Sequence, residues 1–431
     1  MAILQFGLLL GSFLLFLGLG VPVFFSMGLA SLVFIVFQGG SVPLNVLASS
    51  LVQGIDSFSF LAIPFFFLAG DLMNTGGITR RLLAFSASLV GHVRGGLSHV
   101  AIVASMIFSG VSGSAVADAS AIGSVMIPAM KADRYPPAYA AAVVASAATM
   151  GPIIPPSIAF VVYALLAEVS VGRLFLAGVL PGLLMGGYLM LAAWLIARRR
   201  GFPRAPRAPF RTVRAAFAGA SLALVMPLII MGGIVFGVVT PTEAGAVAVV
   251  YGLAVGVCVF RDLKPRALFR ICTDSMINAC TILLMIAAAG TFSWLVANMN
   301  LGEMLVRFFT GLTTSRWVML LIINVFFLVW GLALDIIVGM VVMVPLLVPV
   351  ASAYGIDPVQ FGVIVTLNLL IGELTPPSGV ILFISAGIAG ARLEAVFREA
   401  APFALALVAV LALVTYVPAL TLWLPGVLMG R

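Results

Sequence analysis

Apolar runs long enough to cross a bilayer recur along nearly the whole chain of 431 residues. Hydrophobic residues make up 63% of the chain and charged residues only 8%, a balance far outside that of soluble domains. The sequence lacks the alternating pattern of about ten residues that outer-membrane barrels carry. The apolar runs therefore predict an all-α polytopic membrane protein, because helices satisfy every backbone group within lipid.

An arginine-rich segment divides the chain almost in half. Seven arginines lie between residues 198 and 214. If the basic linker 201–214 is cytoplasmic, eighteen of the 22 basic residues fall on the cytoplasmic side, as the positive-inside rule favours. Both termini are then expected on the outer side. Since these arginines abut spanning helices, we expect no nucleic-acid partner. Membrane lipid is expected around the apolar helices of the chain as a whole.

Glycines and prolines repeat at matching positions 221 residues apart. Gly110 matches Gly331, Gly151 matches Gly372, and the proline pair of "GPIIPPS" matches that of "GELTPPSG". We count five full crossings in the first copy, and an odd number places the second copy in the opposite orientation. The sequence thus predicts two inverted-topology repeats, residues 1–200 and 215–431.

Each repeat is expected to contain a re-entrant helical hairpin and a broken helix. We place the hairpins at about 97–129 and 317–351, and the broken helices at about 137–167 and 358–388. A proline removes a backbone donor and clashes with the preceding turn, so each proline pair ends one half-helix and starts another. The hairpin tips should approach each other near the middle of the bilayer. This arrangement is typical of secondary transporters.

The two breaks also predict binding sites. A half-helix leaves unpaired carbonyls at its end, and the next one begins with free amides. Carbonyls together with the hydroxyls of Ser157, Thr375 and Ser378 suit a small hard cation such as Na+, whereas the amides suit a carboxylate. A proline kink with packing value only is the alternative, but two breaks at matched positions favour sites.

Several stretches together carry a family resemblance. They include "LAIPFFFLAG", "SGVSGSAVADASAIGSVMIPAM", "TPTEAGAVAVVYGL" and "GIDPVQFGVIVTLNLLIGELTPPSGV". The chain resembles, over essentially all of its length, the DctM-like large membrane subunit of tripartite ATP-independent periplasmic (TRAP) transporters. The resemblance implies an elevator-type, Na+-coupled importer of a carboxylate-bearing solute in the bacterial inner membrane, with periplasmic termini. It also implies a small four-helix membrane subunit and a periplasmic substrate-binding protein as partners, without an organic cofactor or enzymatic activity.

The resemblance also implies where Na+ binds. Carried onto matching positions, it places one site at Gly331, Gly372, Thr375 and Ser378, and the repeat places the other at Gly110, Gly151, Ile154 and Ser157.

We expect four other polar residues to line the substrate cavity, namely Ser112, Ser114, Thr366 and Asn368. A polar residue in an apolar helix can instead bond a neighbouring helix, so that alternative stays open.

Acidic residues near the hairpin tips and the second break are costly in lipid. Asp118, Asp335 and Glu373 are therefore expected in wet or paired surroundings, with a role in ion coupling or in structure. Asp335 fits the N-terminal cap of a helix equally well. For Glu243, in "TPTEAG", capping is the favoured interpretation.

A scaffold and a moving core are expected. The scaffold comprises 1–56, 175–272 and 402–431, and the transport core comprises 57–172 and 273–398. Segments 43–55 and 262–272 are expected to be interfacial arms between them.

Three other functional classes share some of these features. A divalent-anion/Na+ symporter-type carrier would work without partners. An intramembrane aspartyl protease using Asp118 and Asp335 is disfavoured, because its Gly-x-Gly-Asp element is missing. Two opposed hairpins favour alternating access over a channel.

The topology yields a first test. In a chain whose native cysteines are replaced by serine, Ala205→Cys should react with a membrane-impermeant thiol reagent only from the cytoplasmic side, because residue 205 lies in the basic linker. Labelling of intact spheroplasts compared with inside-out vesicles measures this. Labelling of this cysteine in intact spheroplasts would contradict the predicted topology and place the linker on the outer side.

Overall fold

The computed structural model describes residues 2–38, 42–75, 77–261, 263–377 and 379–430, and every regular element within these ranges is a helix. Six of the helices are long and apolar enough to cross a membrane, and two further pairs of helices pass the same criteria together but are bent at a short break. The predicted all-α membrane architecture is confirmed at this level.

The first half of the chain begins with helices that precede the first hairpin. These are α1 (Ala2–Gly18), α2 (Val23–Phe37), α3 (Asn45–Gln53), the 3-10 helix η1 (Phe58–Leu61), α4 (Ala62–Thr75) and α5 (Ile78–Val90). The hairpin and the helices after it follow, as α6 (Gly96–Ser112), α7 (Ala115–Ala132), α8 (Pro137–Ala148), α9 (Ile158–Leu166) and α10 (Val171–Arg200).

The second half has the same order of elements. It starts with α11 (Phe210–Val235), α12 (Pro241–Ala254), the π-helix η2 (Val255–Val259), α13 (Pro265–Asn298) and α14 (Leu301–Leu312). It continues with α15 (Arg316–Gly331), α16 (Ile336–Ala353), α17 (Pro358–Gly372), α18 (Val380–Ala389), α19 (Leu393–Tyr416) and α20 (Ala419–Leu428).

The helix boundaries repeat with the spacing found in the sequence. A shift of 221 residues carries α7 onto α16 at both ends, since 115 + 221 = 336 and 132 + 221 = 353. The predicted hairpins correspond to α6–α7 and α15–α16, and the predicted broken helices correspond to α8–α9 and α17–α18. Both proline pairs lie in the breaks between half-helices.

Three features differ between the halves as far as the structure describes them: η2 and the division into α19 and α20 occur only in the second half, and one helix is continuous there where the first half is bent. In the first half, α3 and the segment that contains η1 and α4 are bent by 59°. In the second half, α13 is one continuous helix of 34 residues, and the expected interfacial arm at 262–272 falls in its first turns from Pro265 onward. The two segments pack together at the bend, where a Cβ on Gly290 would lie 2.8 Å from the Cα of Gly54. Residue 262 lies outside the described residues.

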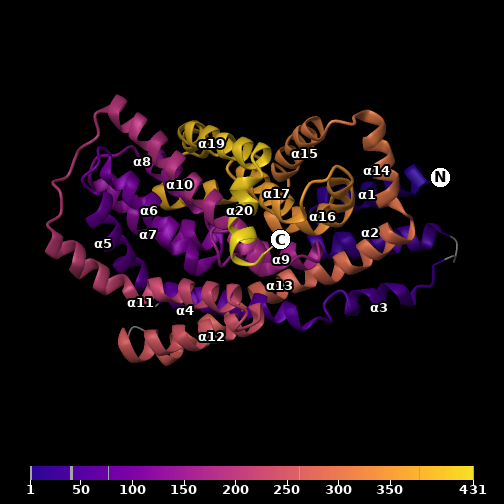
Figure 1. The fold of residues 1–431 in the computed structure, drawn as a ribbon, viewed down its shortest axis with the longest axis horizontal. Coiled ribbons are helices and arrows are strands. Elements are labelled where there is room, and N and C mark those ends of the chain that lie inside the picture. The colour runs from indigo at the N-terminus through magenta and orange to yellow at the C-terminus, as the bar shows by residue number, and fades with distance from the viewer. Residues whose placement is uncertain (1, 39–41, 76, 262, 378, 431) are drawn as a thin grey trace.

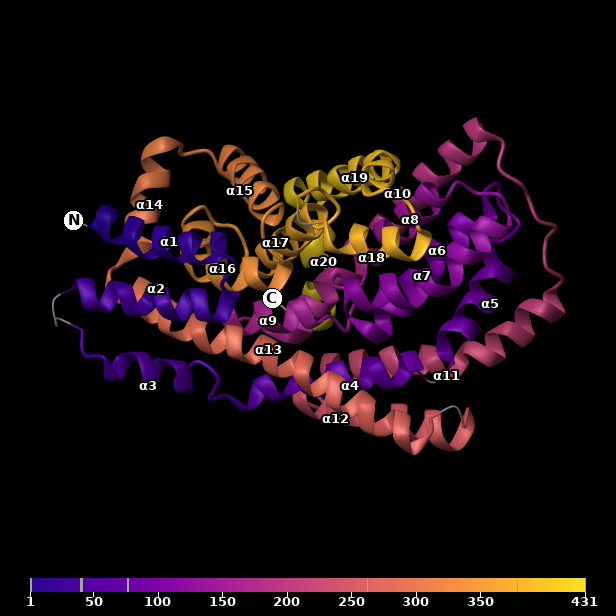
Figure 2. The ribbon, with the colours of Figure 1, turned by 180° about the vertical axis from the view of Figure 1, so that it is seen from behind.

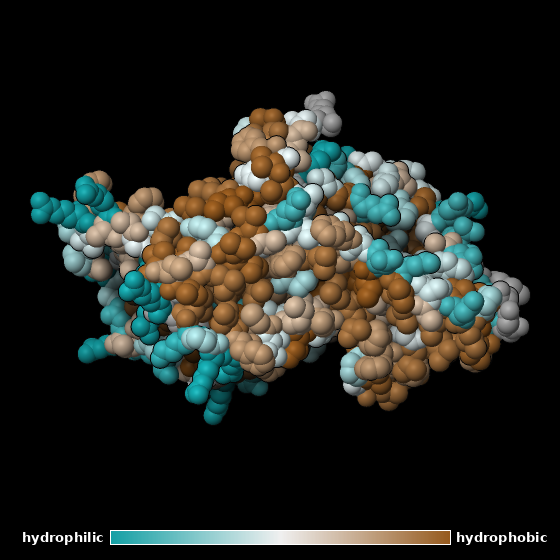
Figure 3. All heavy atoms as spheres, turned by 90° about the horizontal axis from the view of Figure 1, so that it is seen from below, coloured by the Kyte–Doolittle hydropathy of each residue, from teal (hydrophilic) through white to brown (hydrophobic). Residues whose placement is uncertain are grey.

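Helices α3, α4, α11, α12 and α13 form a long layer along one side of the molecule, and the hairpins and broken helices lie on the other side (Figures 1 and 2). Large apolar side chains on this layer point outward: Leu228 is 69% exposed, Phe236 79% and Phe269 78%. From below, apolar residues cover much of the molecular surface and hydrophilic residues gather toward its ends (Figure 3). Such a surface matches lipid or a membrane partner rather than water.

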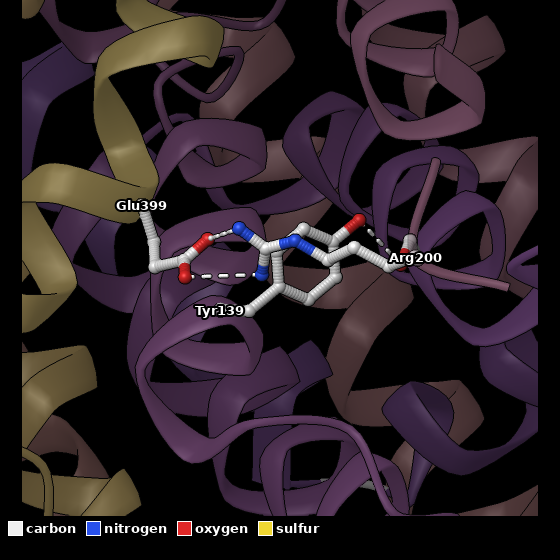
Figure 4. A network of polar contacts seen from close by, with 4 residues as sticks. Tyr139, Arg200 and Glu399 are labelled. Carbon is white, nitrogen blue, oxygen red and sulfur yellow. Dashed lines mark hydrogen bonds and ion pairs between the residues drawn. The ribbon is translucent and has the colours of Figure 1, made fainter. Parts of the chain in front are cut away.

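A polar network joins four helices on the other side of the molecule (Figure 4). Arg200, at the end of α10, forms a two-pronged ion pair with Glu399 of α19, with N–O distances of 2.8 and 3.0 Å. Its guanidinium carbon lies 5.5 Å from the ring centroid of Tyr139 in α8. The Tyr139 hydroxyl in turn lies 3.1 Å from the hydroxyl of Ser98 in α6. The network therefore ties the end of α10 to both the first hairpin and the first broken helix.

Candidate functional site

The tip of the first hairpin rests on the first helix break. Gly113 has a φ of +63°, which lets α6 turn sharply into α7, and a Cβ at this position would lie 2.6 Å from the carbonyl oxygen of Pro156. Ser114 then caps α7 by accepting a hydrogen bond from the amide of Ala117. Gly151 lies against the same turn, since its Cβ would come within 3.0 Å of the Ser114 carbonyl carbon.

The other members of the first predicted Na+ site surround this junction. A Cβ on Gly110 would lie 3.6 Å from the carbonyl oxygen of Pro155. The hydroxyl of Ser157 donates to the carbonyl of Pro152 at 2.6 Å and accepts from the amide of Phe160 at 3.1 Å, so it caps α9. The Ile154 side chain is directed toward Gly182 of α10.

The second hairpin meets its break more closely still. A Cβ on Gly372 would lie 2.4 Å from the carbonyl carbon of Gly331 and 2.6 Å from its oxygen. Thr375 lies one turn further, where its hydroxyl donates to the carbonyl of Ile371 at 3.0 Å. The structure thus brings Gly331 and Gly372 together with Thr375 nearby, while the fourth predicted member, Ser378, lies outside the described residues.

Between the two tips lies a cavity of about 530 Å³, lined by α4, α7, α9 and α13 together with both hairpin tips. Its lining includes the first residues of three helices, Ala115 of α7, Ile158 of α9 and Ile336 of α16. Helix N-termini carry partial positive charge and free amides, so the cavity is suited to a negatively charged group. Neutral polar side chains also line it, namely Asn74, Ser112, Ser114, Ser120, Asn278 and Thr281.

The charged side chains of the cavity are all acidic. Asp71, Asp335 and Glu373 line it, and no lysine, arginine or histidine does so among the described residues. Asp71 accepts a hydrogen bond from Ser275 at 2.6 Å. An anionic ligand in this cavity would therefore meet helix ends, amides and hydroxyls, but would also need a cation to offset the carboxylates.

Asp335 and Glu373 join the second tip to the second break. Asp335 accepts a hydrogen bond from the amide of Ile337 at 2.9 Å, which confirms that it caps α16. Glu373 accepts from the amide of Ile336 at 3.0 Å, so both carboxyl groups gather at the start of α16. A shared proton or a cation must compensate two carboxylates in this contact, because neither has a basic neighbour in the cavity.

Asp118 has a different place. It is fully buried in α7 and accepts hydrogen bonds from Ser112 and, at 2.7 Å, from Ser109, so it fastens the two helices of the first hairpin to each other. It does not belong to the cavity lining. The capping role expected of Glu243 is confirmed, since Thr240 and Glu243 form a capping box at the start of α12.

Thr366 and Asn368 lie away from the cavity. Thr366 donates to the carbonyl of Gly362 at 2.7 Å, within its own helix. Asn368 donates to Asn324 of α15 at 2.7 Å, and Asn324 donates to Thr415 of α19 at 3.1 Å. These two residues therefore do not line this cavity, and the alternative of interhelical bonding describes Asn368.

Two helices supply lining residues that the sequence analysis missed. On α4 they are Phe67, Gly70, Asp71 and Asn74, and on α13 they are Asn278, Thr281, Ile282 and Met285. Both sets have the spacing i, i+3, i+4 and i+7, which marks one face of a helix. This periodicity, together with the echo between "DSFSFLAIPFFFLAG" and "DSMINACTILLMIAAAG", was the signal that could have identified them.

The cavity adjoins a second pocket. Asn74 lines both, and α7 contributes Ser120 to the first and Ser124 to the second. The second pocket, of about 600 Å³, also contains Thr79 and Arg80. A polar track therefore extends from the cavity along α4 and α7 toward the start of α5.

The contact between Gly331 and Gly372 yields a second test. Gly372→Ala should lower the stability of the folded protein by about 1–3 kcal/mol, because the added methyl group overlaps the Gly331 carbonyl and must separate the tip from the break. The apparent melting temperature of the detergent-purified protein measures this.

Gly387→Ala is the matched control, since α18 leaves open space around that position. Equal melting temperatures for the two variants would contradict the contact.

Comparison with known proteins agrees with this architecture. The family described as "Tripartite ATP-independent periplasmic transporter, DctM component" matches residues 10–420. The chain is 40% identical over 425 residues to the sialic acid TRAP transporter large permease protein SiaM of Vibrio cholerae, covering 98% of this chain and 99% of that one. It is 39% identical over 402 residues to the C4-dicarboxylate TRAP transporter large permease protein DctM of Pseudomonas aeruginosa, covering 93% and 94%.

A solved structure shares the fold at low identity. The YdaH transporter of Alcanivorax borkumensis superposes with a TM-score of 0.65 at 17% identity, covering 90% of each chain. The curated relatives are named as transporter permeases and not as enzymes, which removes the protease alternative. The chain belongs to the DctM family, the large permease subunits of TRAP transporters.

Proposed function

We propose that this subunit imports a carboxylate-bearing solute by Na+-coupled secondary transport, and that the cavity between the hairpin tips binds the solute. The observation that carries the proposal is the charge pattern of that cavity. The N-termini of α7 and α9 and six neutral polar side chains can hold a carboxylate, since that of α16 already binds Asp335 and Glu373. Three acidic side chains and the absence of any basic one among the described lining residues call for cations.

Na+ is the cation that the two tip–break junctions suit best. At each junction a backbone carbonyl faces a glycine of the opposing segment, the Pro155 carbonyl at Gly110 and the Gly331 carbonyl at Gly372. Oxygen ligands of this kind are typical of Na+ sites in transporters with broken helices. Binding of Na+ at a junction would fix the adjacent tip and so couple ion binding to the shape of the cavity.

The nature of the solute follows from the same cavity and from the relatives. Three relatives are named for sialic acid, C4-dicarboxylates and 2,3-diketo-L-gulonate, which carry a carboxylate, and another is named for isethionate, which carries a sulfonate. Membership of the family supports a small membrane subunit and a periplasmic substrate-binding protein as partners. We further propose that the core of hairpins and broken helices moves against the scaffold as an elevator, in two repeats of inverted topology.

Reconstitution of all three proteins tests the coupling. Liposomes that contain both membrane subunits should accumulate a carboxylate only with an inward Na+ gradient and with the binding protein present. A panel of radiolabelled carboxylates identifies the solute. Replacement of Na+ by K+ is the control for the membrane potential, and uptake that persists in K+ would contradict Na+ coupling.

Omission of the binding protein distinguishes a TRAP transporter from a symporter-type carrier that works without partners. Full uptake without the binding protein would instead support the partner-independent symporter type.

A pair of threonines tests the cavity itself. Thr281→Val should reduce uptake roughly tenfold, because the hydroxyl lines the cavity and can turn its O–H from the Ile277 carbonyl toward a charged solute, which valine cannot do. Initial uptake rates in the same liposomes measure this effect.

Thr366→Val is the matched control, since both hydroxyls donate to the carbonyl four residues earlier but only Thr281 reaches the cavity. Similar losses in the two variants would place the solute elsewhere.

A further inference from the structure

A third pocket, lined by basic residues, lies at the end of α10. The turn between α5 and α6, the last turns of α10 and the basic linker enclose about 650 Å³. Four arginines line it, together with His92 and Trp194: they are Arg94, Arg198, Arg204 and Arg207. No acidic residue lines the pocket, and none of the four arginines has an ion-pair partner among the described residues.

The pocket is held open by fixed backbone contacts. The amide of Gly95 donates to the carbonyl of Pro203 at 3.1 Å, and the Arg204 Nε donates to the carbonyl of His92 at 3.1 Å. Phe202 packs against Tyr135, with ring centroids 4.4 Å apart. The first residues of the linker are therefore anchored, and the arginines gather around one space without a ligand having to order the chain.

An exposed apolar stripe leads up to the pocket. Leu191, Trp194 and Leu195 of α10 are 52%, 36% and 46% exposed. With Arg198 they have the spacing i, i+3, i+4 and i+7, so they share one face of the helix. The guanidinium carbon of Arg198 lies 5.5 Å from the ring centroid of Trp194, which places the positive charge directly beside the apolar stripe.

We propose that this pocket binds the headgroup of an anionic phospholipid, with the acyl chains along the α10 stripe. Arginines suit a phosphodiester because a guanidinium can donate two parallel hydrogen bonds to its oxygens. The basic cluster lies at the end of α10, a helix long and apolar enough to cross a membrane, and basic clusters beside such helices attract anionic lipids. The apolar stripe distinguishes this ligand from free phosphate, since a soluble anion gains nothing from Leu191 or Leu195.

Native mass spectrometry of the full chain in detergent tests the site, with phosphatidylglycerol as the probe and phosphatidylethanolamine as the neutral comparison. The variant R94Q/R198Q/R204Q/R207Q should bind phosphatidylglycerol more weakly, by roughly fivefold for each arginine removed. Arg204→Gln alone should give one such step, which keeps the test informative if the quadruple variant does not fold.

The variant R211Q/R214Q/R266Q/R270Q is the matched control, because it removes the same charge from exposed positions outside the pocket. The affinity of this variant for phosphatidylglycerol should stay within about twofold of the wild-type value, because exposed charges away from the pocket act only weakly on the bound lipid. Equal loss in both quadruple variants would overturn the site in favour of a general effect of charge.

Two competitors separate lipid from soluble anion. Inorganic phosphate and deacylated glycerophosphoglycerol should each fail to displace phosphatidylglycerol from the wild-type chain at equimolar concentration. Displacement by either would show that the headgroup phosphate alone is recognised and would overturn the proposed lipid site.

Discussion

A backbone break inside a bilayer must be covered by protein, because lipid offers no partner to free peptide groups. In this protein each break is covered by the tip of a hairpin. Gly113 lies over Pro156 in the first half, and Gly331 lies over Gly372 in the second. These positions need glycine because the tip and the break approach too closely for a side chain. A methyl group on Gly372 would overlap the facing carbonyl of Gly331. The cavity exists because these two junctions lie on either side of it.

The junctions also determine the electrostatics of the cavity. Two helices begin at the hairpin tips and one at the first break, so α7, α16 and α9 direct their N-termini into one space. Asp335 and Glu373 are acidic residues at the second junction. The first junction, by contrast, has neutral residues together with Asp118, which is buried behind the hairpin tip. This asymmetry gives a physical reason for the two junctions to differ in cation affinity.

Sequence reasoning succeeded where a residue type has one structural consequence. Proline pairs and matched glycines located both hairpins and both breaks, because few backbones accommodate them. It failed where a side chain has several acceptable partners: Asn368 bonds Asn324 instead of lining the cavity. The expected interfacial arm at 262–272 stays a prediction, since its residues from Pro265 onward form the first turns of the continuous helix α13. The polar faces of α4 and α13 were readable from their periodicity.

The central claim is that the space between the hairpin tips is a single transport site with access to both sides of the membrane in turn. Ser120→Cys, a nearly isosteric change in the cavity lining of a cysteine-free chain, tests it most directly. The account predicts that an impermeant thiol reagent modifies this cysteine from either face of the membrane, whereas Leu228→Cys on the exposed apolar surface reacts from neither. Reaction of position 120 from one face only, under every Na+ gradient, would contradict alternating access to this cavity.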